Sequence, residues 1–139
     1  MQNSAVTCTN MQPLLVLVAG PYRSGTGDDP EKLAANVDAM NRVALDVFRA
    51  GHTPVTGEAL ALPLVELAGS RRVGDEVFDE IFHPISRRLV ARCDAVLRIG
   101  GPSLGADEMV ALARREQARG HERRAAPACL TCSRASARG

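Results

Sequence analysis

The sequence predicts an α/β protein in which helices surround a parallel β-sheet. Three short apolar segments have the composition of strands, and a segment with helical spacing follows each of them. Glycine-rich turns come directly after the first and the third strand. Alternating strands and helices are typical of parallel sheets, in which ligands bind beyond the carboxyl ends of the strands. We therefore expect a binding site where the two glycine-rich turns meet.

The first strand and the first helix have the clearest signals. Residues 14–19 (LLVLVA) are a continuous apolar run that stops at a Gly-Pro pair, as expected for a strand buried on both faces. Asp29 then supplies a helix N-cap, and Pro30 suits the first helical position. Apolar residues recur at helical spacing up to Gly51, which we expect to end the helix as its C-cap.

The rest of the pattern is weaker because two prolines fall inside it. Residues 57–72 are ambiguous, since Pro63 would interrupt a helix there. Pro84 is expected either to kink a later helix or to divide it into two pieces. The remaining predicted elements are a strand at 52–56, a helix at 75–92, a strand at 94–100 and a helix at 106–119.

A further strand is expected after the last helix, but the sequence does not predict one. Residues 120–139 contain one large apolar residue, Leu130, among arginine, alanine and serine. We therefore divide the chain into a disordered segment at 1–13, a domain at 14–119 whose sheet lacks its last strand, and a disordered or aberrant tail at 120–139. Two explanations stay open for this tail: a native disordered segment, or a C-terminus altered by a shift of reading frame.

Composition excludes several classes of partner. The chain has 139 residues, 45% of them apolar, and a formal net charge of +1, as expected for one globular domain. Residues 114–139 are basic, but no aromatic residue accompanies the arginines, so we expect no nucleic-acid partner. The longest apolar run is too short to span a membrane, and the N-terminus lacks the features of a secretory signal. We therefore predict a cytoplasmic protein that does not associate with membranes.

Neither a metal site nor a catalytic triad is predicted. Cys129 and Cys132 form one C-x-x-C pair, without a second pair or a nearby histidine at ligand spacing. The three histidines are scattered, at His52, His83 and His121. We expect no metal and no cofactor, which leaves a carboxylate as the candidate catalytic group.

The first glycine-rich turn, residues 20–29, has the parts of an anion site. It lacks both the G-x-G-x-x-G pattern and the lysine of a phosphate-binding P-loop. Gly20 and the glycines after it free backbone N–H groups, Arg23 supplies a cation, and a helix N-terminus follows. The alternative is a turn without a ligand, in which Arg23 is an ordinary exposed side chain and Tyr22, the only tyrosine, covers the core.

The second turn combines a hydroxyl with a helix N-terminus. Ser103 and Gly105 precede a helix whose first turn contains Asp107 and Glu108. A serine, free N–H groups and a helix dipole suit a phosphate, although Ser103 is equally suited to be an N-cap. Arg98, near the end of the third strand, is expected to reach the same edge, unless it only extends its charged end to solvent.

Three segments together resemble a known family. AGPY after the first strand, CDAVLRIGG over the third and PSLGADEMVALA at the last helix are similar to the nucleoside 2-deoxyribosyltransferase-like superfamily, which includes the deoxynucleoside 5′-monophosphate N-glycosidases. The resemblance spans residues 14–119 and implies a Rossmann-like three-layer fold and a homodimer. It also implies cleavage or exchange at the bond between base and sugar, through a glutamate that attacks C1′ of a nucleoside or its 5′-monophosphate.

The resemblance implies roles for matched residues, and it also exposes two departures. The residues that would line the nucleotide are Gly20, Pro21, Tyr22 and Arg23, while Ser103 and Gly105 would hold a 5′-phosphate. The position of the nucleophile, four residues after the glycine of Ser-x-Gly, is Met109, and Glu108 lies one residue early. An aspartate expected eight residues before Asp94 is replaced by Ser86.

These departures leave more than one function open. The first hypothesis is an N-glycosidase or deoxyribosyltransferase that uses Glu108, with Asp75 or Asp79 as its partner. The second is a non-catalytic nucleotide-binding module that keeps the two turns. A third is a fold similar to the cytokinin-activating phosphoribohydrolases, whose PGGxGTxxE turn GGPSLGADE matches loosely. A purely structural protein is the least favoured, because two glycine-rich turns share one sheet edge.

Overall fold

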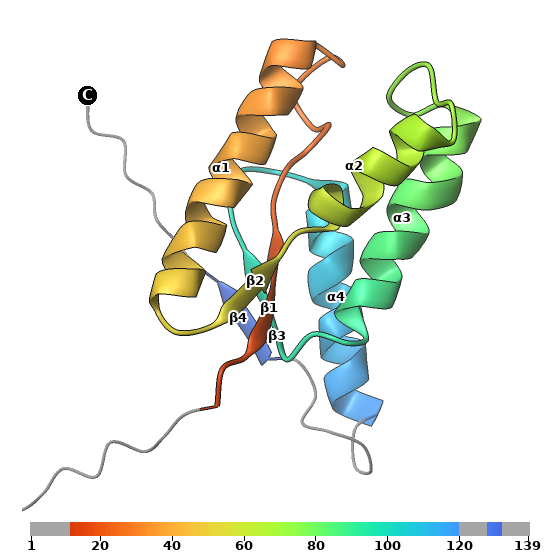
Figure 1. Ribbon diagram of the computed structural model, residues 1–139. Coiled ribbons are helices and arrows are strands. Elements are labelled where there is room, and N and C mark those ends of the chain that lie inside the picture. Colours follow the sequence, from red (N-terminus) through yellow and green to blue (C-terminus); the bar gives the residue numbers. More distant parts are fainter. Residues whose placement is uncertain (1–11, 120–127, 132–139) are drawn as a thin grey trace, which may run out of the picture.

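A computed structural model describes residues 12–119 and 128–131. Within these residues four helices flank a parallel sheet of four strands (Figure 1). The elements in chain order are β1 (Leu15–Ala19), α1 (Pro30–Arg49), β2 (Thr53–Val55), α2 (Gly57–Leu67), α3 (Glu76–Val90), β3 (Ala95–Arg98), α4 (Leu104–Arg119) and β4 (Ala128–Thr131). The predicted α/β class is confirmed.

The order of the strands brings the two glycine-rich turns together. The order is β2-β1-β3-β4, and every neighbouring pair is parallel. β1 lies between β2 and β3, with Leu17 opposite both Val55 and Val96. The segments that follow β1, β2 and β3 therefore leave the sheet at the same edge. This is the edge at which parallel sheets bind ligands.

Helices cover both faces of the sheet, which makes the fold a Rossmann-like three-layer architecture. Figure 1 shows α1 on one side and α3 and α4 on the other, with α2 beside α3. Successive side chains of β1 alternate between the two faces. Val18 packs with Met40 of α1, whereas Leu17 packs with Met109 and other residues of α4. Both layers are thus anchored on the strand that ends at the first turn.

The helix boundaries follow the predicted capping residues. The Asp29 side chain accepts a hydrogen bond from the backbone N–H of Glu31 at 2.8 Å, and Pro30 is the first residue of α1. At the other end Ala50 is the cap residue, and Gly51 follows with a φ of +95°. Glycine adopts this left-handed conformation without strain, so Gly51 ends the helix as predicted.

Two helices continue through their prolines. Pro63 lies inside α2 and Pro84 inside α3, so the ambiguous segment is helical as far as Leu67 and the later helix is not divided. A proline removes one backbone hydrogen bond from a helix but does not prevent side-chain packing on either side of it. The two helices pack against each other, and α2 buries Ala61 and Val65. Within the described residues no helix is long and apolar enough to cross a membrane.

One strand was not predicted. The composition of the residues after 119 gives no signal for a strand, but Ala128–Thr131 forms β4, which pairs in parallel with β3. The backbone hydrogen bonds of a strand at the edge of a sheet do not require a run of large apolar side chains, so composition gave no signal. The described residues exclude 1–11, 120–127 and 132–139. The disorder predicted for 1–13 and 120–139 falls on these excluded residues, except at 12–13 and in β4.

Candidate functional site

A cavity of about 170 Å³ lies at the carboxyl edge of the sheet. Its floor is formed by the end of β1, and its walls by the start of α2, the middle of α3 and the start of α4. Of the predicted site residues, Gly20, Tyr22, Arg23, Ser103, Gly105 and Glu108 line it. The structure therefore brings both predicted turns into one cavity.

Gly20 is required by the packing beneath this cavity. A Cβ atom at Gly20 would lie 2.9 Å from Cγ1 of Ile99 and 3.2 Å from Cγ of Met40. Contacts this short would force both side chains to move. The first turn is also held from outside, because the Asn36 side chain donates a hydrogen bond of 2.8 Å to the backbone carbonyl of Tyr22. Tyr22 is thereby directed into the cavity.

Three of the four aromatic residues form one wall of the cavity. Tyr22 stacks on Phe82 with a centroid distance of 5.3 Å, and Phe82 stacks on Phe78 at 4.6 Å. Phe78 and Phe82 are four residues apart on α3, so both rings face the same side of the helix. Aromatic residues make up only 3% of the chain, which by itself indicates little stacking surface. Composition counts residues but does not place them, and here the few rings are concentrated at the site.

Glu58 enters the cavity from the first turn of α2, directly after β2. It is 9% exposed, and no cationic side chain of the described residues pairs with it. Burial raises the pKa of Glu58 to about 7, against a smaller lowering by a hydrogen bond to its own backbone N–H. Near neutral pH this carboxyl group therefore exists in both the protonated and the ionised form, which suits an acid that also acts as a base.

Tyr22 shares this environment. Burial is the main cause that raises the pKa of Tyr22, and the negative charges of Glu58 and then Asp28 raise it further. The phenol is consequently a hydrogen-bond donor at neutral pH. Glu58 and Tyr22 both line the cavity.

The sequence analysis missed Glu58, although a signal existed. Ligands bind beyond the ends of parallel strands, and Glu58 lies three residues after β2 in the same way that Tyr22 follows β1. Pro63 makes the pattern of residues 57–72 ambiguous, so the sequence alone does not place Glu58 at the edge of the sheet. Phe78, Phe82 and His83 were missed as site residues for a similar reason: a helical pattern identifies the apolar face but not the cavity that part of it lines.

Glu108 lines the cavity as well, at its α4 side. Its Oε1 atom accepts a hydrogen bond of 3.0 Å from Nε of Arg87 on α3, and the side chain is 40% exposed. The neighbouring Met109, which occupies the position expected of a nucleophile, is buried in the core. A glutamate attacks as a nucleophile in its carboxylate form, and Glu108 is the side chain of α4 that brings a carboxyl group to this side of the cavity.

The second turn combines a helix start with an available hydroxyl. Ser103 is 8% exposed, and its oxygen accepts a hydrogen bond of 3.2 Å from the backbone N–H of Ala106. Ser103 therefore acts as an N-cap through its oxygen, and its hydroxyl hydrogen stays free to donate to a ligand. Nothing lies within 4 Å of a Cβ atom built on Gly105. The first N–H groups of α4 are thus open to an anionic group.

Arg98 and Pro21 do not line the cavity. Arg98 donates from Nε to Asp107 at 3.0 Å, from Nη2 to the carbonyl of Gly101 at 2.8 Å, and from Nη1 to the carbonyl of Ile99. It therefore fixes the second turn against the start of α4, which is a positioning role. Pro21 lies under the same turn, 2.7 Å from a Cβ atom built on Gly100, whose φ is +73°.

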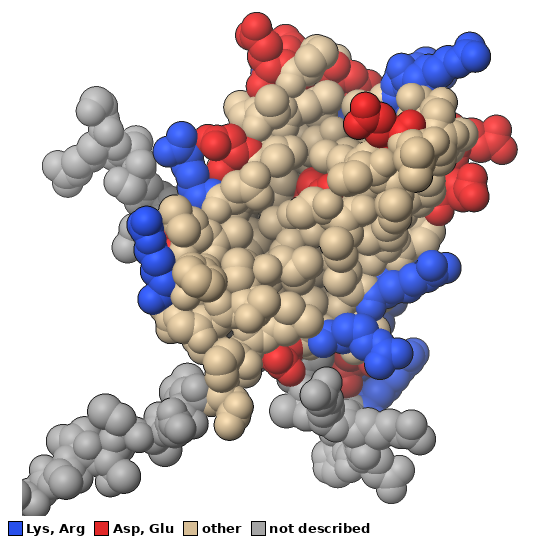
Figure 2. Space-filling model, viewed as in Figure 1, with Lys and Arg blue, Asp and Glu red and all other residues tan. Residues whose placement is uncertain are grey.

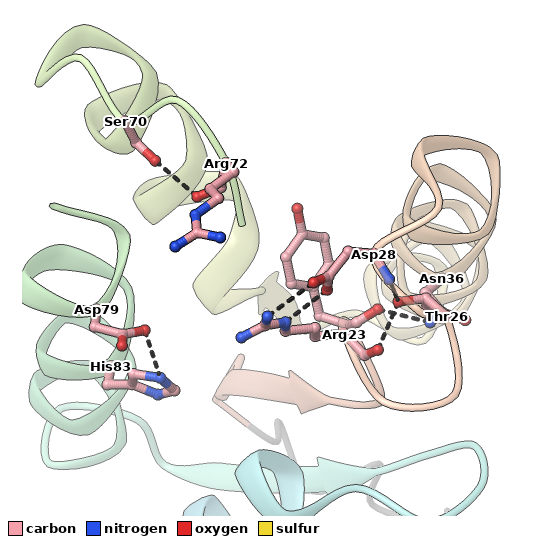
Figure 3. Close-up of polar contacts among 9 residues, drawn as sticks. Arg23, Thr26, Asp28, Asn36, Ser70, Arg72, Asp79 and His83 are labelled. Carbon is pink, nitrogen blue, oxygen red and sulfur yellow. Dashed lines mark hydrogen bonds and ion pairs between the residues drawn. The ribbon is translucent and has the colours of Figure 1, made fainter. Parts of the chain in front are cut away.

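The described part of the chain offers no set of side chains that could bind a metal ion. No group of three or more histidine, cysteine, aspartate or glutamate side chains there could hold a metal ion. His83 lines the cavity, but its Nε2 atom lies 3.6 Å from Oδ1 of Asp79 alone (Figure 3). Cys93 is buried, and burial raises the pKa of its thiol to about 11. Two carboxyl groups, those of Glu58 and Glu108, line the cavity.

Comparison with known proteins adds no family. No protein-family model matches the chain, and no curated protein is similar to it.

Proposed function

We propose that the protein binds a nucleoside or its 5′-monophosphate and cleaves or exchanges the bond between the base and the sugar. The observation that carries this proposal is one cavity lined by two carboxyl groups of different character. Glu58 is buried and unpaired, whereas Glu108 is half-exposed and paired with Arg87. Enzymes that break glycosidic bonds use such a pair, one carboxylic acid and one carboxylate.

Each group then has a defined part in the reaction. The Glu108 carboxylate attacks C1′, and the C1′–N bond breaks as the electron pair leaves with the base. Glu58 gives its proton to the departing base and becomes a carboxylate. A water molecule then attacks C1′, Glu58 takes its proton, and Glu108 is released; a second base in place of water gives exchange. Both carboxyl groups return to their starting forms.

The remaining cavity residues match the other parts of a nucleotide. The stacked rings of Tyr22, Phe78 and Phe82 offer a flat apolar surface for the base. Ser103 and the start of α4 offer donors for a 5′-phosphate. The resemblance to the nucleoside 2-deoxyribosyltransferase-like superfamily supports the same assignment. We include in the proposal that Glu58, rather than Asp75 or Asp79, is the partner of Glu108.

A second function is favoured by one observation and is kept as the alternative. The Arg87–Glu108 ion pair occupies the carboxylate that must attack C1′. If that pair persists when a nucleotide binds, the protein is a nucleotide-binding module without turnover. The aromatic wall and the helix start serve both functions equally well.

A homodimer belongs to the proposal because α2 leaves an apolar stripe uncovered. Leu60, Leu64 and Leu67 are 47%, 48% and 84% exposed, and their spacing puts them along one face of α2. The middle of the molecular face in Figure 2 likewise carries few charged side chains. A twofold interface must complement itself, which an uncharged apolar stripe does. We propose that a second copy of the chain packs on this stripe, next to the helix start that carries Glu58.

The test follows release of free base from a panel of nucleosides and 5′-monophosphates. Glu58→Gln and Glu108→Gln should each lower the rate by about a hundredfold or more, the usual contribution of a catalytic carboxyl group. Glu66→Gln, an exposed residue of the same helix α2, is the matched control and should react normally. Thermal stabilisation by a nucleotide without base release would identify the binding module. If neither release nor stabilisation occurs with any member of the panel, the proposal is wrong.

A further inference from the structure

A second cavity adjoins the first, between the turn after β1 and the loop that leads into α3. It has a volume of about 600 Å³, and Arg23, Arg71, Arg72 and Gly74 are among the residues that line it. Arg23 lines both cavities. A ligand that occupies the first cavity can therefore extend past Arg23 into the second.

Cations outnumber carboxylates among the side chains that line the second cavity. Arg23 forms a two-pronged ion pair with Asp28, with distances of 2.6 Å and 2.8 Å. The guanidinium groups of Arg71 and Arg72 have no hydrogen-bond or ion-pair partner within the described residues. Figure 3 shows the guanidinium groups of Arg23 and Arg72 pointing into the same gap, with Asp28 beside Arg23. Three cations thus face one carboxylate that is already paired.

The backbone that carries the unpaired arginines is held in place. The Asp75 carboxylate accepts hydrogen bonds from the backbone N–H of Arg71 at 2.9 Å and of Arg72 at 3.4 Å. It also accepts one from the Ser70 hydroxyl at 2.8 Å and caps α3 through the N–H of Phe78. These bonds, that of Phe78 first, lower the pKa of Asp75 to about 2. The backbone of the loop is fixed, and it presents two exposed guanidinium groups that have no hydrogen-bond or ion-pair partner among the described residues.

Arg23 is positioned by contact with Gly74. A Cβ atom at Gly74 would lie 2.0 Å from Nη1 of Arg23, so only glycine leaves room for the guanidinium group. The φ of Gly74 is +79°, which glycine also tolerates best. The loop after α2 and the turn after β1 are therefore fitted to each other at the junction of the two cavities.

We infer that the second cavity binds a further phosphate group of a nucleotide whose base and sugar occupy the first cavity. Ser103 and the start of α4 accommodate one phosphate, and the three arginines accommodate another. Guanidinium groups bind phosphate oxygens with two parallel hydrogen bonds, so arginine is the residue best suited to this ligand. The site selects nucleoside 5′-diphosphates over 5′-monophosphates. The nucleoside part of this inference rests on the proposed function, whereas the anion site does not.

Calorimetric titration tests the inference with a nucleoside, its 5′-monophosphate, its 5′-diphosphate and free pyrophosphate. We expect the diphosphate to bind the wild-type protein about tenfold more tightly than the monophosphate, the size of one charge-assisted contact to an exposed arginine pair. The double variant Arg71→Ala/Arg72→Ala should lose this preference. Arg88→Ala/Arg92→Ala removes the same charge from the last turn of α3 and the segment just after it, and should keep the preference.

A pair of glycine variants tests the junction separately. Gly74→Ala should weaken diphosphate binding, because the new methyl group displaces Arg23. Gly69→Ala is the matched control: its φ of +86° imposes similar backbone strain, but nothing lies within 4 Å of the added Cβ atom. Gly69→Ala should therefore keep the diphosphate preference even if both variants unfold at a lower temperature.

The outcomes separate this inference from the proposed function. Binding of pyrophosphate that depends on Arg71 and Arg72, without binding of any nucleoside, supports the anion site and contradicts the proposed function. Equal binding of monophosphate and diphosphate by the wild-type protein overturns the inference, and so does a tenfold preference that survives in Arg71→Ala/Arg72→Ala. Binding of none of the four compounds overturns both.

Discussion

Replacing Glu58 by glutamine should make the protein more stable at alkaline pH and leave its stability unchanged at acidic pH. The reason is that the native protein holds the Glu58 carboxyl group in a buried cavity without a cationic partner. Burial disfavours the ionised form, so the native state keeps the proton up to a pKa of about 7. In the unfolded chain the same group ionises near its ordinary value of 4.5.

The sign and the size of the effect follow from proton linkage. Between pH 4.5 and about 7 the folded state binds more protons at Glu58 than the unfolded state, so the free energy of unfolding falls as the pH rises. Each pH unit of difference corresponds to 1.36 kcal/mol. The interval of about 2.5 pH units therefore gives a loss of about 3 kcal/mol that is complete above pH 7. Glutamine has nearly the same shape but never ionises, so the variant avoids this loss.

The assay is urea unfolding at a series of pH values from 4 to 8, with the wild-type protein and Glu58→Gln in parallel. The difference in unfolding free energy between them should be close to zero at pH 4 and about 3 kcal/mol in favour of the variant at pH 8. Other titrating groups act on both proteins and cancel in this difference. Glu66→Gln, exposed on the same helix, should follow the wild-type curve. A constant difference across this pH range would refute the assignment of Glu58 as a buried, unpaired carboxyl group.

Three other predictions concern neighbouring features of the fold. Gly57→Ala should lower the unfolding free energy by about 1–3 kcal/mol, because its Cβ atom would lie 2.5 Å from the Ser86 Oγ atom. Gly105→Ala, whose Cβ atom would lie in open space at the start of α4, should not lower the unfolding free energy, and chemical unfolding compares the two variants. The wild-type protein should lose stability as the pH falls from about 4 towards the Asp75 pKa of about 2, since this carboxylate caps α3 only when ionised; thermal unfolding of Asp75→Asn should lack that loss. Leu64→Glu should convert a dimer into a monomer in analytical ultracentrifugation, because it places a charge in the middle of the α2 stripe; a wild-type monomer would contradict the proposed interface.

The sequence predicts the fold class and the edge of the sheet at which the cavity lies, because both depend on local signals. The run that becomes β1 and the Asp29-Pro30 start of α1 need no information from distant residues. The ends of parallel strands meet at one edge, so two turns in sequence become one cavity without further assumptions. The aromatic wall could not be predicted in this way. It depends on how α3 is rotated toward the turn after β1, which is a property of the packed molecule.

The position of Glu108 shows how packing decides what a helical register leaves open. The α4 residues Ala106, Met109, Val110 and Ala113 are buried, and their spacing of three and four residues sets the face that meets the sheet. Met109 is therefore in the core, and Glu108, about 100° around the helix, lies at the margin of the cavity. A glutamate side chain is long enough to line the cavity from this margin and still reach Arg87 at 3.0 Å.

A similar argument applies to the carboxylate that is missing from α3. The resemblance implies an aspartate where the chain has Ser86, and sequence comparison by position finds no acid to replace it. In space, the start of α2 lies directly against that position, since a Cβ atom on Gly57 would lie 2.5 Å from Ser86 Oγ. The residue after Gly57 is Glu58, so a carboxyl group from another element lies next to the vacant position. We propose that Glu58 is exchanged for this aspartate, and the small residues Ser86 and Gly57 allow it, because a larger residue at either position would hold the helices apart. The variant Ser86→Asp tests the exchange: it should crowd Gly57 and lower stability, rather than restore base release in Glu58→Gln.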